Sequence, residues 1–332
     1  MKEYTNYSLL NHNTFGMDVE AKRFVEYDSE EELIGLLPSL ESKYLHIGGG
    51  SNLLFRGNFD GTILHSVIKG IEIQENCGEY VLVRVGAGVV WDDFVAWTVE
   101  RGWGGIENLS LIPGEVGASA VQNIGAYGVE AKDVIVQVKA IHLKTGEKRS
   151  FVTDECCYAY RQSIFKNELK GQYAITYVTY KLKVRPTLKL SYGNMKALLE
   201  KKNVTVSDVR QFIIDTRNAK LPDPKVLGNA GSFFMNPVVS RDKFQEIQKD
   251  YPQMPYYEVE NGVKIPAGWM IEQCGWKGKS LGKAGVHEKQ ALVLVNLGGA
   301  SSEEIVTLCN AVCKDVKETF GIDIHPEVNF IN

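Results

Sequence analysis

The stretch from Ile112 to Gly128 constrains this chain most, because it is rich in small residues and almost free of charge. Glycine stands at Gly114, Gly117, Gly125 and Gly128, and alanine or serine fills further positions. Residues this small let a backbone segment, a flat ring or a pyrophosphate approach closely. A long apolar loop is seldom only a connector. The stretch therefore predicts a binding surface, and tight packing against a preceding domain is the alternative.

A second glycine-rich segment, Gly48-Gly49-Gly50-Ser51-Asn52, follows a short strand predicted over residues 44–47. Consecutive backbone N–H groups in such a turn form a nest that binds phosphate oxygens without positive side chains. The spacing is not G-x-G-x-x-G, and apolar residues follow in place of a clear helix start. The segment is therefore not the Rossmann dinucleotide motif, and a plain glycine-rich turn is the alternative interpretation.

A third segment, Gly228–Pro237, places Ser232 between small residues and the aromatic pair Phe233-Phe234. Small residues bring the backbone close to a neighbouring group, and the aromatic rings wall it off. A serine in a dry, closely approached pocket is a candidate proton donor. The alternative is a glycine-rich turn that enters a buried strand.

Two charged residues far apart in the chain are candidates for the same site. Arg161 stands among aromatic residues in the segment Tyr160–Lys166, and its planar guanidinium suits two-point contact with a carboxylate or a phosphate. Glu327 lies in the C-terminal tail between His325-Pro326 and apolar residues. The alternatives are an arginine packed over a tyrosine ring and a solvated carboxylate.

Length, charge and cysteine spacing limit the possible function classes. A chain of 332 residues predicts about two or three domains. The net charge of −4 gives no electrostatic support for nucleic-acid binding. The six cysteines lack C-x-x-C pairs, so we expect no metal site. No signal-peptide core or membrane-length apolar run occurs, and we expect a cytoplasmic protein with no membrane partner.

The order of helical and extended patterns favours an α+β fold over a doubly wound parallel sheet, because helices mix with several hairpins. Pro222 and Pro224 break the pattern after residue 220 and indicate a linker. The expected helices cover residues 91–101, 207–220, 241–250, 266–274 and 301–320, and the expected strands cover 80–85, 134–143, 147–152, 174–184 and 291–296.

Several motifs occur here in the order typical of one family. They are GGGSN, IPG-x-VG, QNIGAYG, YR-x-SIFK, KLPDPKVLGNAGSFF-x-NP and HPEV. On these motifs the chain resembles the UDP-N-acetylenolpyruvoylglucosamine reductases, flavoenzymes of bacterial cell-wall precursor synthesis, from Asn13 to the C-terminal tail. The resemblance implies a vanillyl-alcohol-oxidase-type FAD-binding module of two subdomains, residues 1–70 and 71–220, and a separate α+β substrate-binding domain, residues 221–323. The tail, residues 324–332, would pack back on residues 71–220.

The resemblance also implies the residues of the active site. Ser232 would be the proton donor, with Arg161 and Glu327 as its catalytic partners. Non-covalent FAD would lie on Gly48, Gly49, Gly50, Ser51, Asn52, Ile112, Pro113, Gly114, Gly117, Ser119, Asn123, Gly125 and Gly128. The substrate would be bound by Tyr192, Arg217, Lys220, Asn236 and Gln290, of which Tyr192 matches the mobile tyrosine loop of the family's long form.

A few positions depart from the family pattern. Gln162 stands where many members have aspartate, and Met235 stands where lysine is frequent. Asn329 stands where many members have arginine, which weakens a charged contact between this position and the flavin. None of these changes removes a group that the chemistry needs.

The implied activity is reduction of the enolpyruvyl group of a UDP-sugar, UDP-N-acetylglucosamine enolpyruvate, with NADPH as the source of electrons and FAD as the hydride carrier. We expect a monomer. Two alternatives remain open: a flavin-dependent oxidase of sugars or hydroxy acids, and a nucleotide-sugar-binding module without catalysis. The oxidase would react rapidly with oxygen, and the binding module would hold no flavin.

Overall fold

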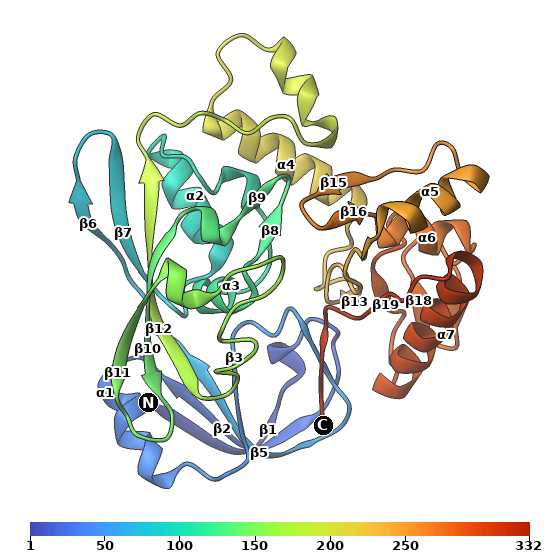
Figure 1. The fold of residues 1–332 in the computed structure, drawn as a ribbon. Helices are drawn as coiled ribbons and strands as arrows, with labels where there is room; N and C mark the ends of the chain where they lie inside the picture. The colour runs from blue at the N-terminus through green and yellow to red at the C-terminus, as the bar shows by residue number, and fades with distance from the viewer. The chain divides into compact units, whose positions relative to one another are not determined.

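The computed structural model describes residues 1–332, except for the side chain of Asn194. The chain forms two compact units (Figure 1). Unit 1 comprises residues 1–7, 21–49 and 60–217, and unit 2 comprises residues 8–20, 50–59 and 218–332. Each unit has its own hydrophobic core. The three-part division at residues 70 and 220 stays a prediction.

Unit 1 begins with a four-stranded sheet whose strand order is β1-β2-β5-β3. β3 runs parallel to β5, with Ile47 opposite His65. The Ser29 hydroxyl accepts a hydrogen bond of 3.2 Å from the Glu32 backbone N–H and so caps α1. The strands and helix are β1 (Lys2–Ser8), β2 (Glu20–Tyr27), β3 (Tyr44–Ile47), β5 (Phe59–Ser66) and α1 (Glu30–Leu36).

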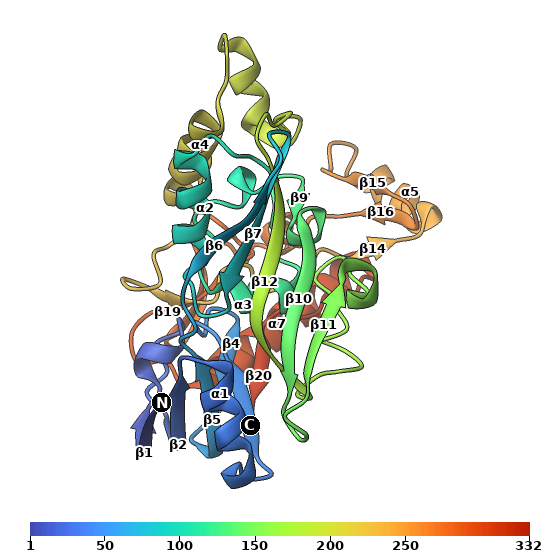
Figure 2. The same ribbon diagram turned by 90° about the vertical axis from the view of Figure 1, so that its left-hand side faces the viewer.

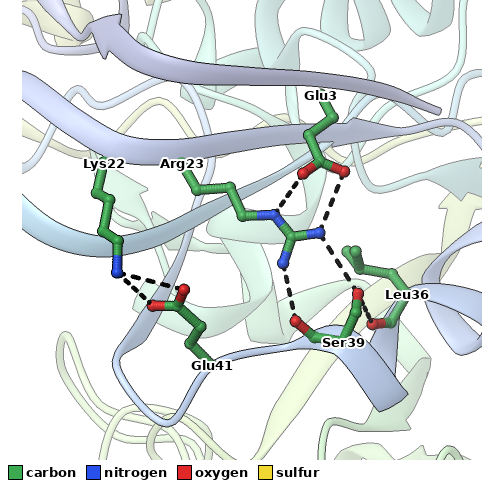
Figure 3. Close-up of polar contacts among 6 residues, drawn as sticks. All are labelled: Glu3, Lys22, Arg23, Leu36, Ser39 and Glu41. Atoms are coloured by element: carbon green, nitrogen blue, oxygen red, sulfur yellow. Dashed lines mark hydrogen bonds and ion pairs between the residues drawn. The ribbon is translucent and has the colours of Figure 1, made fainter.

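Arg23 connects this sheet to the segment after α1 (Figure 3). Its guanidinium donates to both carboxylate oxygens of Glu3 at 2.8 and 3.1 Å, and to the backbone oxygen of Ser39 at 2.9 Å. Lys22 forms a second, more exposed ion pair with Glu41 at 3.2 Å. The two-point arginine pair fixes β1 beside β2.

A five-stranded antiparallel sheet of order β11-β10-β12-β7-β6 forms the rest of the unit 1 scaffold (Figure 2). The helices α2 and α3 pack beside it. Trp91 and Phe94 of α2 are buried against Tyr180 of β12. The elements are β6 (Ile71–Asn76), β7 (Tyr80–Gly86), β10 (Ile135–His142), β11 (Lys148–Val152), β12 (Tyr173–Lys183), α2 (Trp91–Glu100) and α3 (Val116–Gln122).

Shorter elements complete unit 1. β8 (Gly125–Ala126) and β9 (Val129–Glu130) form a small hairpin just after α3. The helix α4 (Val206–Lys220) buries Val209 and Ile213 against Leu190 and Met195, and its last residues belong to unit 2. The 3-10 helices of unit 1 cover residues 37–39, 107–109, 131–133, 153–156 and 193–200, and a further one, residues 10–12, belongs to unit 2.

Unit 2 holds a four-stranded sheet, β13-β19-β18-β17, and a three-stranded sheet, β14-β16-β15. The capping box at Ser301 and Glu304 starts the long helix α7, close to the predicted start at residue 301. The elements are β13 (Gly228–Asn229), β14 (Val238–Val239), β15 (Tyr257–Val259), β16 (Gly262–Lys264), β17 (Ser280–Leu281), β18 (Ala284–Val286), β19 (Leu294–Asn296), α5 (Arg241–Asp250), α6 (Ala267–Gln273) and α7 (Ser302–Phe320).

The C-terminal tail forms the strand β20 (Asn329–Ile331), which pairs in parallel with β4 (Leu53–Phe55) inside unit 2. Its expected packing on residues 71–220 stays a prediction. Within the described part of the chain, no helix combines the length and the apolar character that crossing a bilayer requires.

Candidate active site

Gly48 and Gly49 lie tightly against the start of α3 in unit 1. A Cβ atom on Gly48 would stand 3.2 Å from Glu115 Oε2 and 3.3 Å from Ala118 Cβ. A Cβ atom on Gly49 would stand 3.4 Å from Gly114 Cα. The two glycines therefore allow a close approach between the first glycine segment and the longer glycine-rich stretch, as the small residues of both predict.

Gly50 and the residues after it belong to unit 2. Gly50 has a φ of +65°, and a Cβ atom there would lie 1.9 Å from the backbone oxygen of His12. Only glycine fits this position without a shift of the backbone. The Asn52 side chain donates to the backbone oxygen of Glu327 at 3.2 Å, and the Asn329 N–H donates to the Asn52 oxygen at 3.0 Å.

The polar residues of the stretch 112–128 hold the local fold. The Ser119 hydroxyl donates to the Val116 oxygen at 2.7 Å and lies 3.0 Å from the Tyr180 hydroxyl. Asn123 is fully buried in the left-handed conformation and receives a hydrogen bond of 3.0 Å from the Lys132 N–H. Their predicted contacts with FAD stay predictions, and so do those of Ile112, Pro113, Gly117 and Gly128.

Arg161 lies against the same loop. Its Nη2 donates to the Gly125 oxygen at 2.5 Å, and its Nη1 donates to the Asn123 oxygen at 3.4 Å. The Lys166 ammonium group donates to the Arg161 backbone oxygen at 3.0 Å. Arg161 also has a φ of +56°, which is costly for a residue with a side chain and is typical of functional sites.

Two of the predicted substrate residues meet at Tyr127 in unit 1. The Tyr192 ring stands edge-on to the Tyr127 ring with centroids 6.2 Å apart. Burial lowers the pKa of Arg217, and the opposing effects of Tyr127 and Asp92 are smaller. The Arg217 Nε atom is buried and has no hydrogen-bond partner among the described residues. Such a donor is costly unless another group accepts from it, so this cluster fits a polar or anionic ligand.

Ser232 and Glu327 stand on paired segments of unit 2. The Glu327 N–H donates to the Phe233 oxygen at 2.8 Å, and the Met235 N–H donates to the His325 oxygen at 3.0 Å. Phe233 and Phe234 are buried, but Ser232 is exposed, so the core of unit 2 does not enclose the serine, and its place in a dry pocket stays a prediction. The physical reason is that the aromatic rings fill the core of unit 2 and leave the serine outside it.

Asn236 and Gln290 both face the first turn of α6. The Asn236 side-chain oxygen accepts a hydrogen bond of 2.9 Å from the Ala267 N–H. The Gln290 side-chain oxygen accepts one of 3.3 Å from the Leu292 N–H and would lie 3.0 Å from a Cβ atom on Gly268. Lys220 is exposed at the end of α4. The structure thus brings Asn236 and Gln290 together.

Comparison with known proteins matches the N-terminal and the C-terminal part of the chain to two family models. A family model for the FAD binding domain matches residues 21–150, and a model for the C-terminal domain of UDP-N-acetylenolpyruvoylglucosamine reductase matches residues 223–331. The reductase of Bacteroides fragilis is 58% identical over 98% of this chain and 99% of its own length. The chain belongs to the UDP-N-acetylenolpyruvoylglucosamine reductase family. The reductase of Flavobacterium johnsoniae is 49% identical, with 100% of both chains covered.

A crystal structure of the Thermus caldophilus member of the UDP-N-acetylenolpyruvoylglucosamine reductase family has the same fold. It matches with a TM-score of 0.70 and 21% identity, over 100% of this chain and 98% of that one. The family assignment and this match confirm the predicted fold class, a vanillyl-alcohol-oxidase-type FAD-binding module followed by an α+β domain. They also confirm the predicted family and the FAD-binding character of the chain.

The site-residue predictions that rest on the UDP-N-acetylenolpyruvoylglucosamine reductase family omitted a buried polar cluster. His65 lies 3.0 Å from a Glu115 oxygen and 3.3 Å from a Glu26 oxygen. The one feature of the sequence that could have indicated this cluster is Glu115, the sole charged residue in the stretch 112–128. A separate cavity of about 510 Å³ in unit 1, lined by Glu107, Lys181 and others, contains none of the predicted site residues.

Proposed function

We propose that this protein reduces the enolpyruvyl group of UDP-N-acetylglucosamine enolpyruvate to give UDP-N-acetylmuramate, with NADPH as the electron source. The observation that carries the proposal is the pairing of the Ser232 and Glu327 segments through Phe233. The names of the relatives support it, because the Bacteroides fragilis protein, 58% identical, is a UDP-N-acetylenolpyruvoylglucosamine reductase.

The residues present fit an FAD site. Gly48 lies close to Glu115 and Ala118, Gly49 lies close to Gly114, and the two glycine-rich segments carry few charges. Such backbone turns bind the phosphates of a nucleotide through N–H groups. Bound FAD would supply the hydride, and the chain would supply binding, orientation and the proton.

Three side chains have distinct roles in the proposed reaction. Arg161 binds the substrate carboxylate, on which negative charge develops as the double bond is reduced. Ser232 donates a proton to the α-carbon, and the strong basicity of the developing enolate compensates for the weak acidity of the hydroxyl. Glu327 assists at the carboxylate when its carboxyl group is protonated.

The remaining predicted residues would hold the UDP-sugar. Tyr192 would cover the diphosphate, and Arg217, with its unpartnered buried Nε, would donate to an anionic group. Lys220, Asn236 and Gln290 would complete the site. We expect the enzyme to act as a monomer in the cytoplasm.

The test is the colour and redox behaviour of the purified protein. The protein should be yellow, should release intact FAD on denaturation and should bleach with NADPH under anaerobic conditions. The enolpyruvyl substrate should then restore the yellow colour, and UDP-N-acetylglucosamine, which lacks the enolpyruvyl group, should not. Rapid reoxidation by oxygen without a response to the substrate would support an oxidase, and absence of flavin would support a binding module.

A further inference from the structure

Glu26, His65 and Glu115 form a continuous polar chain in the interior of unit 1. Glu26 comes from β2, His65 from β5 and Glu115 from the residue before α3. The side chains of His65 and Glu115 are only 10% and 12% exposed, and that of Glu26 is 21% exposed. Burial of a charged group costs free energy unless the group is paired, and here each carboxylate is paired with one ring nitrogen.

The arrangement requires a protonated His65 ring. A neutral imidazole donates from one nitrogen only, so it can satisfy one of the two carboxylates and not both. Burial alone would lower the pKa of His65, but the hydrogen bonds and charges of Glu115 and Glu26 together outweigh it and raise the pKa. The imidazolium therefore bridges β2 and the start of α3.

The second oxygen of Glu115 faces the first glycine segment. Glu115 Oε2 stands 3.2 Å from the position of a Cβ atom on Gly48, and Gly49 lies on the neighbouring Gly114. The backbone of Glu115 is also fixed, because its oxygen accepts from the Ser119 N–H at 3.0 Å. The carboxylate therefore lies beside Gly48, in the space that a side chain at that position would enter.

We propose that His65 is a positioning residue for FAD: it holds the Glu115 carboxylate against Gly48 and so keeps the Gly48-Gly49 turn in the conformation that takes the cofactor. The inference rests on the proposed function only in that this turn belongs to the FAD site. His65 itself contacts neither cofactor nor substrate in this assignment.

Loss of the His65 charge would act through the population of the binding-competent turn. A neutral ring can donate to only one of the two carboxylates, and the other carboxylate then favours a position nearer to water. In the molecules in which Glu115 is the one released, the turn loses the group that lies beside Gly48. The apparent dissociation constant for FAD rises by the inverse of the competent fraction.

The other titratable groups around His65 do not mimic this behaviour. Burial, and to a smaller extent the charge of His65, lower the pKa of His46 to about 4, so His46 stays neutral where His65 titrates. The Tyr27 hydroxyl lies 2.6 Å from His46 Nε2, and burial raises the pKa of Tyr27. Tyr7 faces Glu26, and burial raises its pKa as well. A pH dependence above 6.5 would therefore report on His65.

The experiment measures the FAD dissociation constant of the apoprotein as a function of pH, by quenching of flavin fluorescence. Wild-type affinity should fall as the pH rises through the elevated pKa of His65, by up to about tenfold per pH unit. Glu115→Gln and His65→Gln should bind FAD about tenfold or more weakly at low pH and should show a flat profile. The control is His142→Gln, a partly buried histidine of the same unit whose ring contacts Thr145 and Tyr173.

The outcomes separate this inference from the proposed function. A wild-type protein that binds no FAD at any pH would overturn both. A wild-type protein that binds FAD with no pH dependence above 6.5, or folded variants with wild-type affinity and profile, would overturn the role of His65 alone. The wild-type profile decides the matter even if a variant fails to fold, and thermal unfolding of each apoprotein reports that failure.

Discussion

The backbone N–H of Glu327 donates a 2.8 Å hydrogen bond to the carbonyl oxygen of Phe233, the residue directly after Ser232. Pro326 and Phe234 form the adjacent bridge of this antiparallel pairing. The pairing sets the spacing between the candidate proton donor and the candidate carboxyl group through backbone hydrogen bonds. A substitution of either side chain should therefore leave their supporting segments in place, which makes the residues suitable for kinetic tests.

Replacement of Ser232 by alanine should separate the two half-reactions. Reduction of the flavin by NADPH needs no proton at the substrate carbon and should stay nearly normal. Reoxidation by the enolpyruvyl substrate should slow by about 10²–10⁴-fold, the usual contribution of a positioned general acid. Anaerobic stopped-flow absorbance measures each half-reaction. Ser232→Cys, a stronger acid of similar shape, should retain more activity, and reoxidation of Ser232→Ala at the wild-type rate would show that Ser232 is only a surface residue.

Arg161→Lys should lower turnover by about two orders of magnitude or more, because lysine keeps the charge but loses the planar fork. Steady-state kinetics with the enolpyruvyl substrate measures the loss. Arg161 also donates to the backbone oxygen of Gly125, a predicted FAD-binding residue, so FAD content and thermal unfolding of the variant are the controls for a local structural effect. FAD content and thermal unfolding should stay close to wild type, and near-normal turnover would remove Arg161 from the catalytic group.

Tyr192→Phe should mainly raise KM, because the hydroxyl is expected to bind the diphosphate and to take no part in proton or hydride transfer. Steady-state kinetics separates KM from kcat. Tyr256→Phe is a matched control, an exposed tyrosine of unit 2 whose ring packs on Phe244. A large fall in kcat at unchanged KM would instead make Tyr192 a catalytic residue.

Elements with local start and stop signals could be predicted from the sequence. The strand over residues 44–47 and the helix over residues 241–250 have the predicted bounds, and the Ser301 capping box starts α7. The strands β1, β2 and β5 were not predicted. β5 is buried over nearly its whole length and so shows no alternation, and β1 is almost fully exposed. Their pairing depends on partners far along the chain, which periodicity does not report.

The candidate site shows the same limit. Glycines that face a close neighbour, such as Gly48 and Gly50, follow from the motifs, because a small residue is itself the signal. The exposure of Ser232 and the contact between His65 and Glu115 do not follow from them. Both depend on which residues the fold brings together, and His65 and Glu115 are separated by 50 positions in the chain.

The pair of Asp92 and Arg210 gives a prediction for stability as a function of pH. Arg210 donates to both oxygens of Asp92 at 2.6 and 2.9 Å, and the Leu111 N–H donates to the same carboxylate at 2.5 Å. Burial alone would raise the pKa of Asp92, but these hydrogen bonds and the positive charges outweigh it and lower the pKa below 3.8. The unfolded chain then binds the proton more readily, so the stability from this pair is present above pH 3.8 and is lost as the pH falls through the lowered pKa of the folded state.

Asp92→Asn should destabilise unit 1 by about 1.5–3 kcal/mol near neutral pH, as expected for charge-assisted hydrogen bonds, and by progressively less in acid. Urea unfolding of both proteins at several pH values measures the difference. Glu318→Gln, which removes the exposed pair with Lys314, is the control and should cost about 0–1 kcal/mol. A destabilisation by Asp92→Asn that stays constant from neutral pH to below 3.8 would show that the charge of Asp92 contributes nothing and that only its shape matters.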